Sequence, residues 1–377
     1  MKISIEKKDI IEMLANVQGI AGKRSSLAIT ENIVIKTNKK SISVSATDIE
    51  TGFEGTYPAQ VLEDGIVAIN ARYFYDIVKK VETDTLYVKE EKKQWIQISD
   101  TEDGGRLKYN IMGGNPEDFP QLPRMSNVSY IEVASADFRT MISWATLIGV
   151  SGTEKRAHVI GSNLEFIEDG EIKKIRMVST DGKRLTKTEY PYQIEKKEVE
   201  EKKVILPKKA LNELFKFLKE EGTIHIGVKD NYFIVKNKNE TVYINLLSGE
   251  YPDLKNLFSD STGRTIIRLN RKKFKDMLER MAILTSENYK GVIFNFEKEL
   301  LTINAENPEK GESFECMNIV YDKKPIKIMF NPEYFIDAAN LIEDDEMELK
   351  IKEEQAPCII CGAGHPENIN IIMPMKL

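Results

Sequence analysis

The sequence predicts an α+β fold built from three repeated domains, each with two helices packed on antiparallel sheets. Two observations predict it. A pair of amphipathic helix patterns recurs three times in the same order, and segments of alternating apolar residues lie between and after these helices. The chain has 377 residues, which is too long for one ordinary core. Domains usually hold roughly 100–200 residues.

Each repeat begins with a predicted helix whose apolar residues follow the i, i+3, i+4, i+7 spacing of one buried face. The three first-helix stripes are Ile10, Met13, Leu14, Val17; Phe138, Met141, Ile142, Ala145; and Phe274, Met277, Leu278, Met281. A second helix type has the same spacing. Its stripes are Phe74, Ile77, Val78, Val81; Leu211, Leu214, Phe215, Leu218; and Phe335, Ala338, Ala339, Ile342. Because both types match in order in every copy, coincidence is a poor explanation.

Antiparallel strands are predicted where apolar residues alternate and turn residues follow. Three such segments follow the second helices, at Thr85–Val88, Thr223–Ile226 and Met347–Ile351. Three others run into an acidic or amide turn, at Ser45–Asp48, Val178–Asp181 and Asn304–Asn307. With linkers at Gly113–Pro120 and Ser248–Asp253, the predicted domains are residues 1–122, 123–254 and 255–377.

The composition and the N-terminal segment argue against a membrane-spanning protein and against a secreted protein. Hydrophobic residues make up 41% of the chain and charged residues 30%, and no apolar run is long enough to span a membrane. The N-terminal segment lacks the uninterrupted apolar block of a signal peptide, so a cytoplasmic protein with no membrane partner is expected.

The cysteines raise the question of a metal or redox site. Cys358 and Cys361 form a C-x-x-C pair, which is typical of half a zinc site or of a redox dithiol. A structural zinc site needs four ligands, and no second close pair exists. The remaining candidates are Cys316, His158, His225 and His365. Since the pair lies in an apolar, strand-like run, we expect buried structural thiols, no metal and no cofactor.

The net charge of −6 argues against a simple DNA-binding protein, but its distribution is uneven. The predicted helices near 208–219 and 268–280 are basic, whereas the strand region 343–354 is acidic. Basic runs are often only solvated faces. Alternatively, repeated basic helices could form one DNA-facing surface. No zinc finger or basic zipper is present, so such a surface would contact phosphates without reading sequence.

The chain resembles the beta subunit of bacterial DNA polymerase III, the sliding clamp, over essentially its whole length. The most specific segments are Ala46–Glu50, Ser179–Leu185 and the C-terminal Met373–Leu377. Supporting pieces are Arg24, Gly249–Asp253, Ile283–Leu284 and Tyr289–Gly291.

The resemblance implies a head-to-tail homodimer that closes into a six-domain ring, with helices lining the lumen and sheets outside. Three repeats per chain favour this dimer over the three two-domain chains of the eukaryotic and archaeal clamps. Head-to-tail contacts close into a ring when the rotation permits. The implied function is a processivity factor without catalytic residues. It would encircle duplex DNA without sequence specificity and tether the polymerase.

The resemblance also implies three sets of site residues. The DNA-binding set, in which the two lysines are expected at an exposed helix start, is Arg24, Lys208, Lys209, Tyr289, Asn331 and Tyr334. The partner-peptide groove is Thr180, Gly182, Lys183, Arg184, Leu185, Pro252, Leu257, Ile372, Pro374, Met375 and Lys376. The dimer interface is Leu107, Ile283 and Leu284. Implied partners are duplex DNA, the DNA polymerase III catalytic subunit, the clamp loader, and other replication and repair proteins with clamp-binding motifs.

The chain departs from the family pattern at the groove. Lys183 stands where a histidine is common, and Asn256 stands where a basic residue is common, which affects the preferred partner motif. Two other classes of protein are alternatives to this interpretation. Asp48 and Asp181 could form the metal pair of a nuclease, but no nucleotide-binding or hydrolase motif accompanies them. A repeated-domain scaffold that does not bind DNA is the other alternative.

Overall fold

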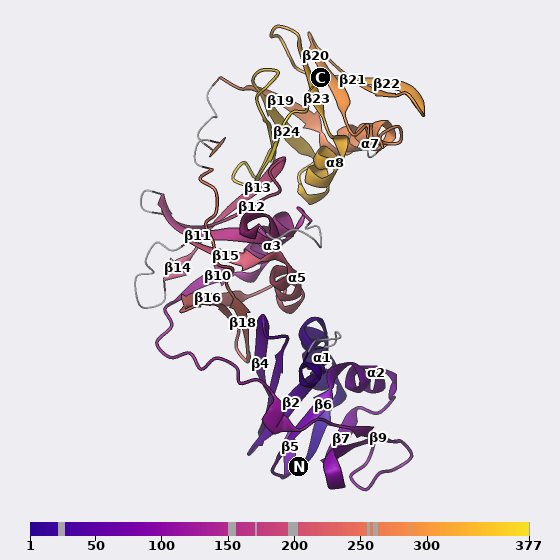
Figure 1. The fold of residues 1–377 in the computed structure, drawn as a ribbon, viewed down its shortest axis with the longest axis vertical. Helices are drawn as coiled ribbons and strands as arrows, with labels where there is room; N and C mark the ends of the chain where they lie inside the picture. Colours follow the sequence, from indigo (N-terminus) through magenta and orange to yellow (C-terminus); the bar gives the residue numbers. More distant parts are fainter. Residues whose placement is uncertain are drawn as a thin grey trace. The chain divides into compact units, whose positions relative to one another are not determined.

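The computed structural model describes residues 1–21, 27–149, 156–169, 172–194, 203–254, 257–258, 263–286 and 288–376. The chain divides into two compact units. The first holds residues 1–139, 192–200 and 209–246, and the second holds residues 140–191, 201–208 and 247–377. Figure 1 shows the elements coloured along the sequence. In the described ranges, no helix has both the length and the apolarity needed to cross a bilayer.

A nine-stranded antiparallel sheet dominates the first unit, in the order β14-β10-β16-β17-β18-β4-β3-β2-β6. Its strands are β2 (Asn32–Asn38), β3 (Ser41–Thr47), β4 (Thr51–Pro58), β6 (Ile66–Asn70), β10 (Tyr130–Ala134), β14 (Gln193–Ile194), β16 (Thr223–Lys229), β17 (Tyr232–Lys236) and β18 (Glu240–Asn245). The sheet joins predicted first-domain strands to second-domain strands, because β4 pairs with β18.

A second sheet of the first unit has five strands in the order β5-β1-β7-β8-β9. They are β1 (Lys2–Glu6), β5 (Gln60–Glu63), β7 (Thr85–Glu90), β8 (Trp95–Ser99) and β9 (Lys108–Met112). The helices of this unit are α1 (Lys7–Ala21), α2 (Ala71–Lys80), the start of α3 (Ser135–Thr146) and α5 (Lys208–Phe217) from its second residue. Most predicted stripe residues are buried, while Ile77 and Phe215 are half-buried.

The second unit holds an eight-stranded sheet, β15-β11-β12-β13-β26-β25-β24-β19, and a four-stranded sheet, β22-β21-β20-β23. The first comprises β11 (Gly161–Asp169), β12 (Ile172–Thr180), β13 (Arg184–Pro191), β15 (Lys203–Pro207), β19 (Thr265–Asn270), β24 (Glu346–Ile351), β25 (Cys358–Gly362) and β26 (Ile369–Ile372). The second comprises β20 (Val292–Glu297), β21 (Leu300–Asn307), β22 (Gly311–Asn318) and β23 (Ile326–Phe330).

Helices of the second unit are α4 (Ala157–Ile160), α7 (Arg271–Ala282), α8 (Pro332–Leu341) and the remainder of α3. Asparagine caps both α7 and α8: Asn270 accepts from the Lys273 N–H and Asn331 from the Glu333 N–H. Pro332 begins α8, where its missing N–H costs no hydrogen bond. Beneath the helices, Phe274, Phe294 and other aromatic rings pack edge-to-face in one core.

The predicted α+β class with repeated helix pairs on antiparallel sheets is confirmed. The compact units nevertheless divide the predicted second domain, because sheets continue across the repeats through β4–β18 and β13–β26 pairing. Strand pairing between neighbouring repeats therefore groups residues differently from sequence repetition. The boundaries at residues 122 and 254 stay a prediction.

The two cysteines of the C-x-x-C segment, Cys358 and Cys361, are buried, as expected. Both lie on β25, and Cys358 packs in one core cluster while Cys361 packs in another. Both are free thiols. Burial raises the pKa of Cys358 to about 12 and also raises that of Cys361, so neither is a thiolate at neutral pH.

Candidate functional site

The hairpin that joins β12 to β13 is a rigid turn. The Thr180 hydroxyl donates to the Arg184 carbonyl at 2.8 Å and accepts from the Gly182 N–H at 3.0 Å. One oxygen of Asp181 accepts from the N–H groups of Lys183 and Arg184. Gly182 has φ +85°, which glycine adopts without steric cost. The turn therefore fixes the direction in which the Lys183 and Arg184 side chains leave the sheet.

The first repeat contains the same turn with different side chains. The Thr47 hydroxyl donates to the Thr51 carbonyl at 3.0 Å and accepts from the Ile49 N–H at 3.0 Å, and Asp48 accepts from the Thr51 N–H. Ile49 occupies the left-handed position with φ 79° and is 56% exposed. Asp48, like its counterpart Asp181, accepts backbone hydrogens of its own turn. That is a structural role, and it argues against the nuclease interpretation.

Arg184 joins the turn to helix α8. Its guanidinium pairs with Asp181 at 3.3 Å and with Asp337 at 2.5 Å. It also stacks over the ring of Tyr334, 4.4 Å from the ring centroid. The structure thus brings a predicted groove residue, Arg184, into contact with Tyr334, which was predicted to face DNA.

An apolar surface lies beside this turn in the second unit. Leu185 belongs to a cluster on β12, β13, β25 and β26, against which the half-buried Leu257 packs. Pro252 is exposed next to Tyr251, whose hydroxyl donates to the Val178 carbonyl at 3.1 Å. The neighbouring cavity of about 390 Å³ is lined in part by Val178, Tyr251 and Pro252.

Three predicted groove residues are not exposed. Thr180, Leu185 and Ile372 are 7%, 3% and 1% exposed, so they support the surface from below rather than forming open walls as predicted. Leu185 and Ile372 are buried because β13 and β26 are inner strands of the eight-stranded sheet, so these side chains enter the core clusters on its faces. The Thr180 hydroxyl is bonded within its own turn.

The C-terminal segment supplies the exposed apolar side chains. Met373 and Met375 are each 39% exposed, with Pro374 half-buried between them and Lys376 exposed after them. The Met373 N–H donates to the Lys183 carbonyl at 2.9 Å, and the Met375 N–H donates to the Met329 carbonyl at 2.8 Å. Two backbone hydrogen bonds therefore hold this segment against the turn and the end of β23.

Lys208 corrects a prediction. It was expected at an exposed helix start, but it is only 3% exposed, and its ammonium group has no hydrogen-bond partner among the described residues. Burial lowers its pKa to about 8, an effect that Asp181 partly offsets and Arg184 reinforces. The local sequence could not predict this burial, because it depends on the packing of Lys208 near distant residues, among them Asp181 and Arg184.

Lys209 is exposed as predicted, but it is already neutralised in part. Its ammonium lies 3.3 Å from Asp48 and 3.2 Å from Glu50. Of the other predicted DNA-binding residues, Tyr289 is 40% exposed, and the Asn331 amide oxygen caps α8 at 3.1 Å from the Glu333 nitrogen. Arg24 lies outside the described residues.

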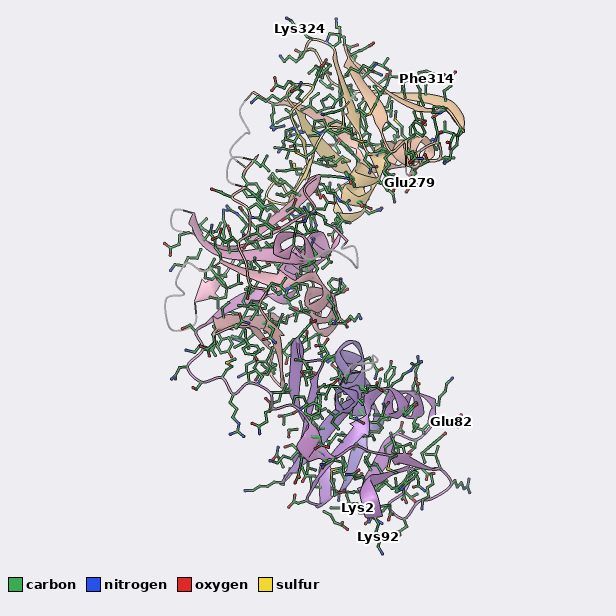
Figure 2. The ribbon with its side chains drawn as sticks, in the orientation of Figure 1. Lys2, Glu82, Lys92, Glu279, Phe314 and Lys324 are labelled. Carbon is green, nitrogen blue, oxygen red and sulfur yellow. The ribbon has the colours of Figure 1, made fainter. Side chains whose placement is uncertain are left out.

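The predicted dimer-interface residues differ in exposure. Ile283, at the end of α7, is 70% exposed, whereas Leu284 packs against the core of the second unit and Leu107 is half-buried. Sequence reasoning missed the two edge strands β9 and β22, on which Tyr109, Met112 and Phe314 are 41%, 55% and 69% exposed. Figure 2 shows Phe314 pointing outward from β22. A large aromatic residue at an alternating position among polar residues was the available signal.

Comparisons with known proteins agree with this geometry. Models of the DNA polymerase III beta subunit match in chain order: the N-terminal domain at residues 1–123, the central domain at 132–253 and the C-terminal domain at 261–376. The chain is 26% identical to the beta sliding clamp of Chlamydia pneumoniae, covering 100% of this chain and 99% of that one. It is 25% identical to the beta sliding clamp of Vibrio cholerae, covering 100% of both chains.

Solved structures share the fold. The DNA polymerase III subunit beta from Pseudomonas aeruginosa matches with a TM-score of 0.90 at 23% identity, over 100% of both chains. The DNA polymerase sliding clamp from Bacillus subtilis matches with a TM-score of 0.89 at 23% identity, over 100% of this chain and 99% of that one. Three domain models in the family's own order, together with relatives matched end to end, account for the whole chain. The chain belongs to the family of bacterial DNA polymerase III beta subunits, the beta sliding clamps.

Proposed function

We propose that this chain is a replication processivity clamp that works as a head-to-tail homodimer closed around duplex DNA. The observation that carries the proposal is that two edge strands, β9 and β22, carry exposed apolar side chains. β9 terminates the five-stranded sheet of the first unit, and β22 terminates the four-stranded sheet of the second. Edge strands present unpaired backbone groups that readily pair with another chain.

The two edges are complementary. The β9 edge is basic and apolar, with Lys108, Tyr109 and Met112 exposed. The β22 edge is acidic and apolar, with Glu312 and Phe314 exposed. Pairing β9 of one copy with β22 of the next would cover both edges and continue the sheet. Because the two surfaces differ, the contact is head-to-tail, and such contacts close into a ring when the rotation permits.

A closed ring holds DNA by topology. It cannot dissociate from a circle even when each phosphate contact is weak, and weak contacts that ignore sequence permit sliding. Lys209, Tyr289 and Asn331 are the described residues that we retain as candidates for these contacts. Lys208 could contribute only if its side chain left its buried position.

The partner site is the surface formed by the Thr180–Arg184 turn, the C-terminal segment and the start of α8. Exposed Met373 and Met375 offer apolar contacts that adapt to different ligands, as methionine-rich surfaces do. Arg184, held by two carboxylates, would orient a polar group of the bound segment. We include Tyr334 in this site because its ring lies under Arg184. The partners would be the polymerase catalytic subunit, the clamp loader and other replication or repair proteins, and no catalysis is assigned.

Solution mass and DNA retention together test the proposal. The 43.1 kDa chain should run as a dimer, and it should remain on nicked circular DNA after loading while sliding off the linear form of the same molecule. Equal retention on circular and linear DNA would overturn the topological role. A monomer at micromolar concentration would overturn the proposed edge pairing.

A further inference from the structure

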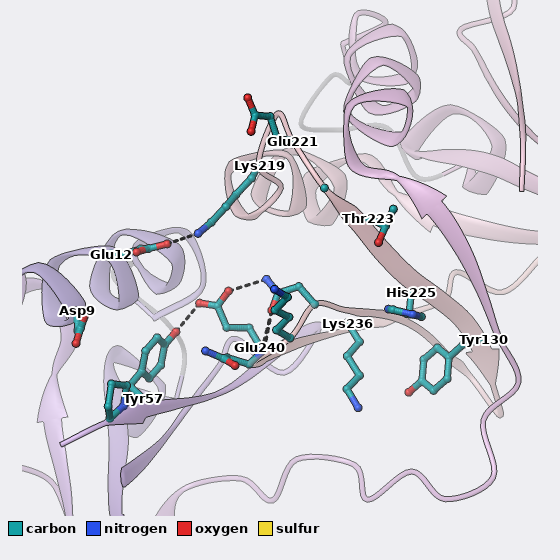
Figure 3. A pocket seen from close by; sticks show the side chains of 15 residues that line it. Asp9, Glu12, Tyr57, Tyr130, Lys219, Glu221, Thr223, His225, Lys236 and Glu240 are labelled. Carbon is teal, nitrogen blue, oxygen red and sulfur yellow. Dashed lines mark hydrogen bonds and ion pairs between the residues drawn. The ribbon is translucent and has the colours of Figure 1, made fainter. Parts of the chain in front are cut away.

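Glu240 is a buried carboxyl group whose side-chain hydrogen-bond donors, among the described residues, are neutral. It begins β18 and is 7% exposed. One of its oxygens accepts from the Tyr57 hydroxyl at 2.5 Å and from the Asn16 amide at 2.8 Å, and the other accepts from the Asn237 amide at 2.8 Å. Figure 3 shows Tyr57 and Glu240 pointing toward one another across the cavity. A buried charge is tolerated only when such bonds replace its hydration.

The donors come from segments far apart in the sequence. Tyr57 lies on β4 and Asn16 on α1, whereas Glu240 and Asn237 lie around the turn before β18. β18 pairs with β4 along its length, with Glu240 opposite Gly55, and the Thr56 N–H donates to the Asn239 carbonyl at 2.9 Å. The carboxylate therefore lies at one end of the seam where strands of the first and second repeats meet.

Gly55 provides the space for this arrangement. A Cβ atom at position 55 would lie 2.8 Å from both Cε2 and the hydroxyl oxygen of Tyr57, closer than real contacts allow. The missing side chain lets the tyrosine ring lie flat across its own strand and reach the neighbouring one. Any side chain here would displace the ring from Glu240.

The backbone ladder aligns the two strands from Glu240 opposite Gly55 to Ile244 opposite Thr51, and beyond it the Asn245 N–H donates to the Glu50 carbonyl at 2.9 Å. The other side-chain contacts near the Glu240 end are weaker or non-directional. Lys219 pairs with Glu12 at 2.5 Å, but both side chains are more than half exposed, and exposed pairs contribute little. Phe53 and Phe217 meet edge-to-face at 6.3 Å, which adds burial but does not define a register. The same cavity, of about 970 Å³, is lined by Glu12, Tyr57, Lys219 and Glu240.

We propose that the Glu240 carboxylate is a clasp that keeps one end of the β4–β18 seam closed, where Glu240 lies opposite Gly55. Without it, this end of the seam frays, because it loses its three side-chain hydrogen bonds while the ladder toward Thr51 and Ile244 stays paired. The clasp is independent of the DNA role proposed above.

Hydrogen–deuterium exchange of the full-length chain tests the clasp. In Glu240→Ala and Tyr57→Phe, amides at the clasped end of the seam, in Glu54–Tyr57 and Glu240–Val242, should exchange at least tenfold faster than in the wild type. Amides of Val292–Asn307, in the second unit, should be unchanged and report that the variant is folded. Glu12→Gln, which faces the same cavity, should leave the seam unchanged.

Two results would overturn the proposal: wild-type exchange at the seam in both variants, or equal acceleration in Glu12→Gln. If Glu240→Ala also speeds amide exchange in the second unit, the test rests on the nearly isosteric Tyr57→Phe variant alone. Acceleration confined to the seam in that variant supports the clasp, and none refutes it.

Discussion

The guanidinium of Arg184 lies over the ring of Tyr334, 4.4 Å from its centroid, while two carboxylates hold its edges. A cation held on an aromatic face by Asp181 and Asp337 has little freedom to rotate. Arg184 is therefore held in one position, and it joins helix α8 to the β12–β13 turn. This contact is the reason for placing Tyr334 in the proposed partner site, whereas its DNA-facing role stays a prediction from the sequence.

Removing the ring should separate the two assignments of Tyr334. Tyr334→Ala should weaken binding of a clamp-binding peptide from the replicative polymerase roughly tenfold, because Arg184 loses its support. Tyr334→Phe keeps the ring and should bind within about twofold of wild type. Fluorescence titration measures both. A Tyr334→Ala variant that binds peptide normally but loses retention on circular DNA would restore the DNA-facing assignment.

A charge on the β22 edge should prevent dimerisation. Phe314→Asp should give folded monomers of 43.1 kDa, because an exposed aromatic is replaced by a third acid beside Glu312 and Glu315. Ile283→Asp should act similarly, whereas Leu284 is a poor test because it packs in the core. Light scattering after size exclusion gives the mass. Ile172→Asp, an equally drastic change at a 54% exposed site on β12, is the control and should stay dimeric.

Lys208 should make stability depend on pH. Burial lowers its folded pKa to about 8, so the unfolded chain binds more protons between about pH 8 and 10, and stability rises with pH across that window. Below pH 8 the buried charge costs about 3 kcal/mol, taking about 1.4 kcal/mol per pKa unit. Lys208→Met should therefore raise the thermal midpoint at pH 7, and the gain should shrink by pH 9.5.

The neighbouring lysine provides the control for that experiment. Lys209→Met removes an exposed cation with two acidic partners, so it should lower or leave unchanged the midpoint at pH 7. A similar gain from both variants would mean that burial of Lys208 is not the cause. The comparison uses midpoints, since a multi-unit chain need not unfold in one step.

The turns at Thr47–Thr51 and Thr180–Arg184 have the same hydrogen bonds but carry Ile49 and Gly182 at the left-handed position. Exchanging isoleucine and glycine at this position should change stability in opposite directions. Gly182→Ile should destabilise by about 1–2 kcal/mol, because a side chain is disfavoured at φ +85° although nothing within 4 Å of its Cβ would clash. Ile49→Gly should be neutral or stabilise by up to about 1 kcal/mol, since relief of strain is offset by glycine's freedom in the unfolded chain. Urea unfolding compares the two, and a clear loss of stability in Ile49→Gly would contradict the strain argument.

The sequence by itself determined the elements. Phe274, Met277 and Leu278 recur at helical spacing, and every predicted first-helix stripe is buried, because amphipathic periodicity depends only on neighbours along the chain. The turn predicted at the end of Val178–Asp181 likewise follows from local backbone preference, since Asp-Gly favours a tight hairpin. Repetition of these local patterns was enough to predict three copies of one architecture.

Only the tertiary structure decided where individual side chains stand. The local sequence around Lys208 predicts an exposed cation, yet the side chain is buried near Asp181. Arg184 and Tyr334 meet although they are 150 positions apart, and Phe314 is exposed because β22 ends a sheet. These outcomes depend on which distant segments pack together, and the periodicity of a local segment does not predict that packing. Burial of a long flexible side chain and the exposure of a strand edge are properties of the folded neighbourhood, not of the residue.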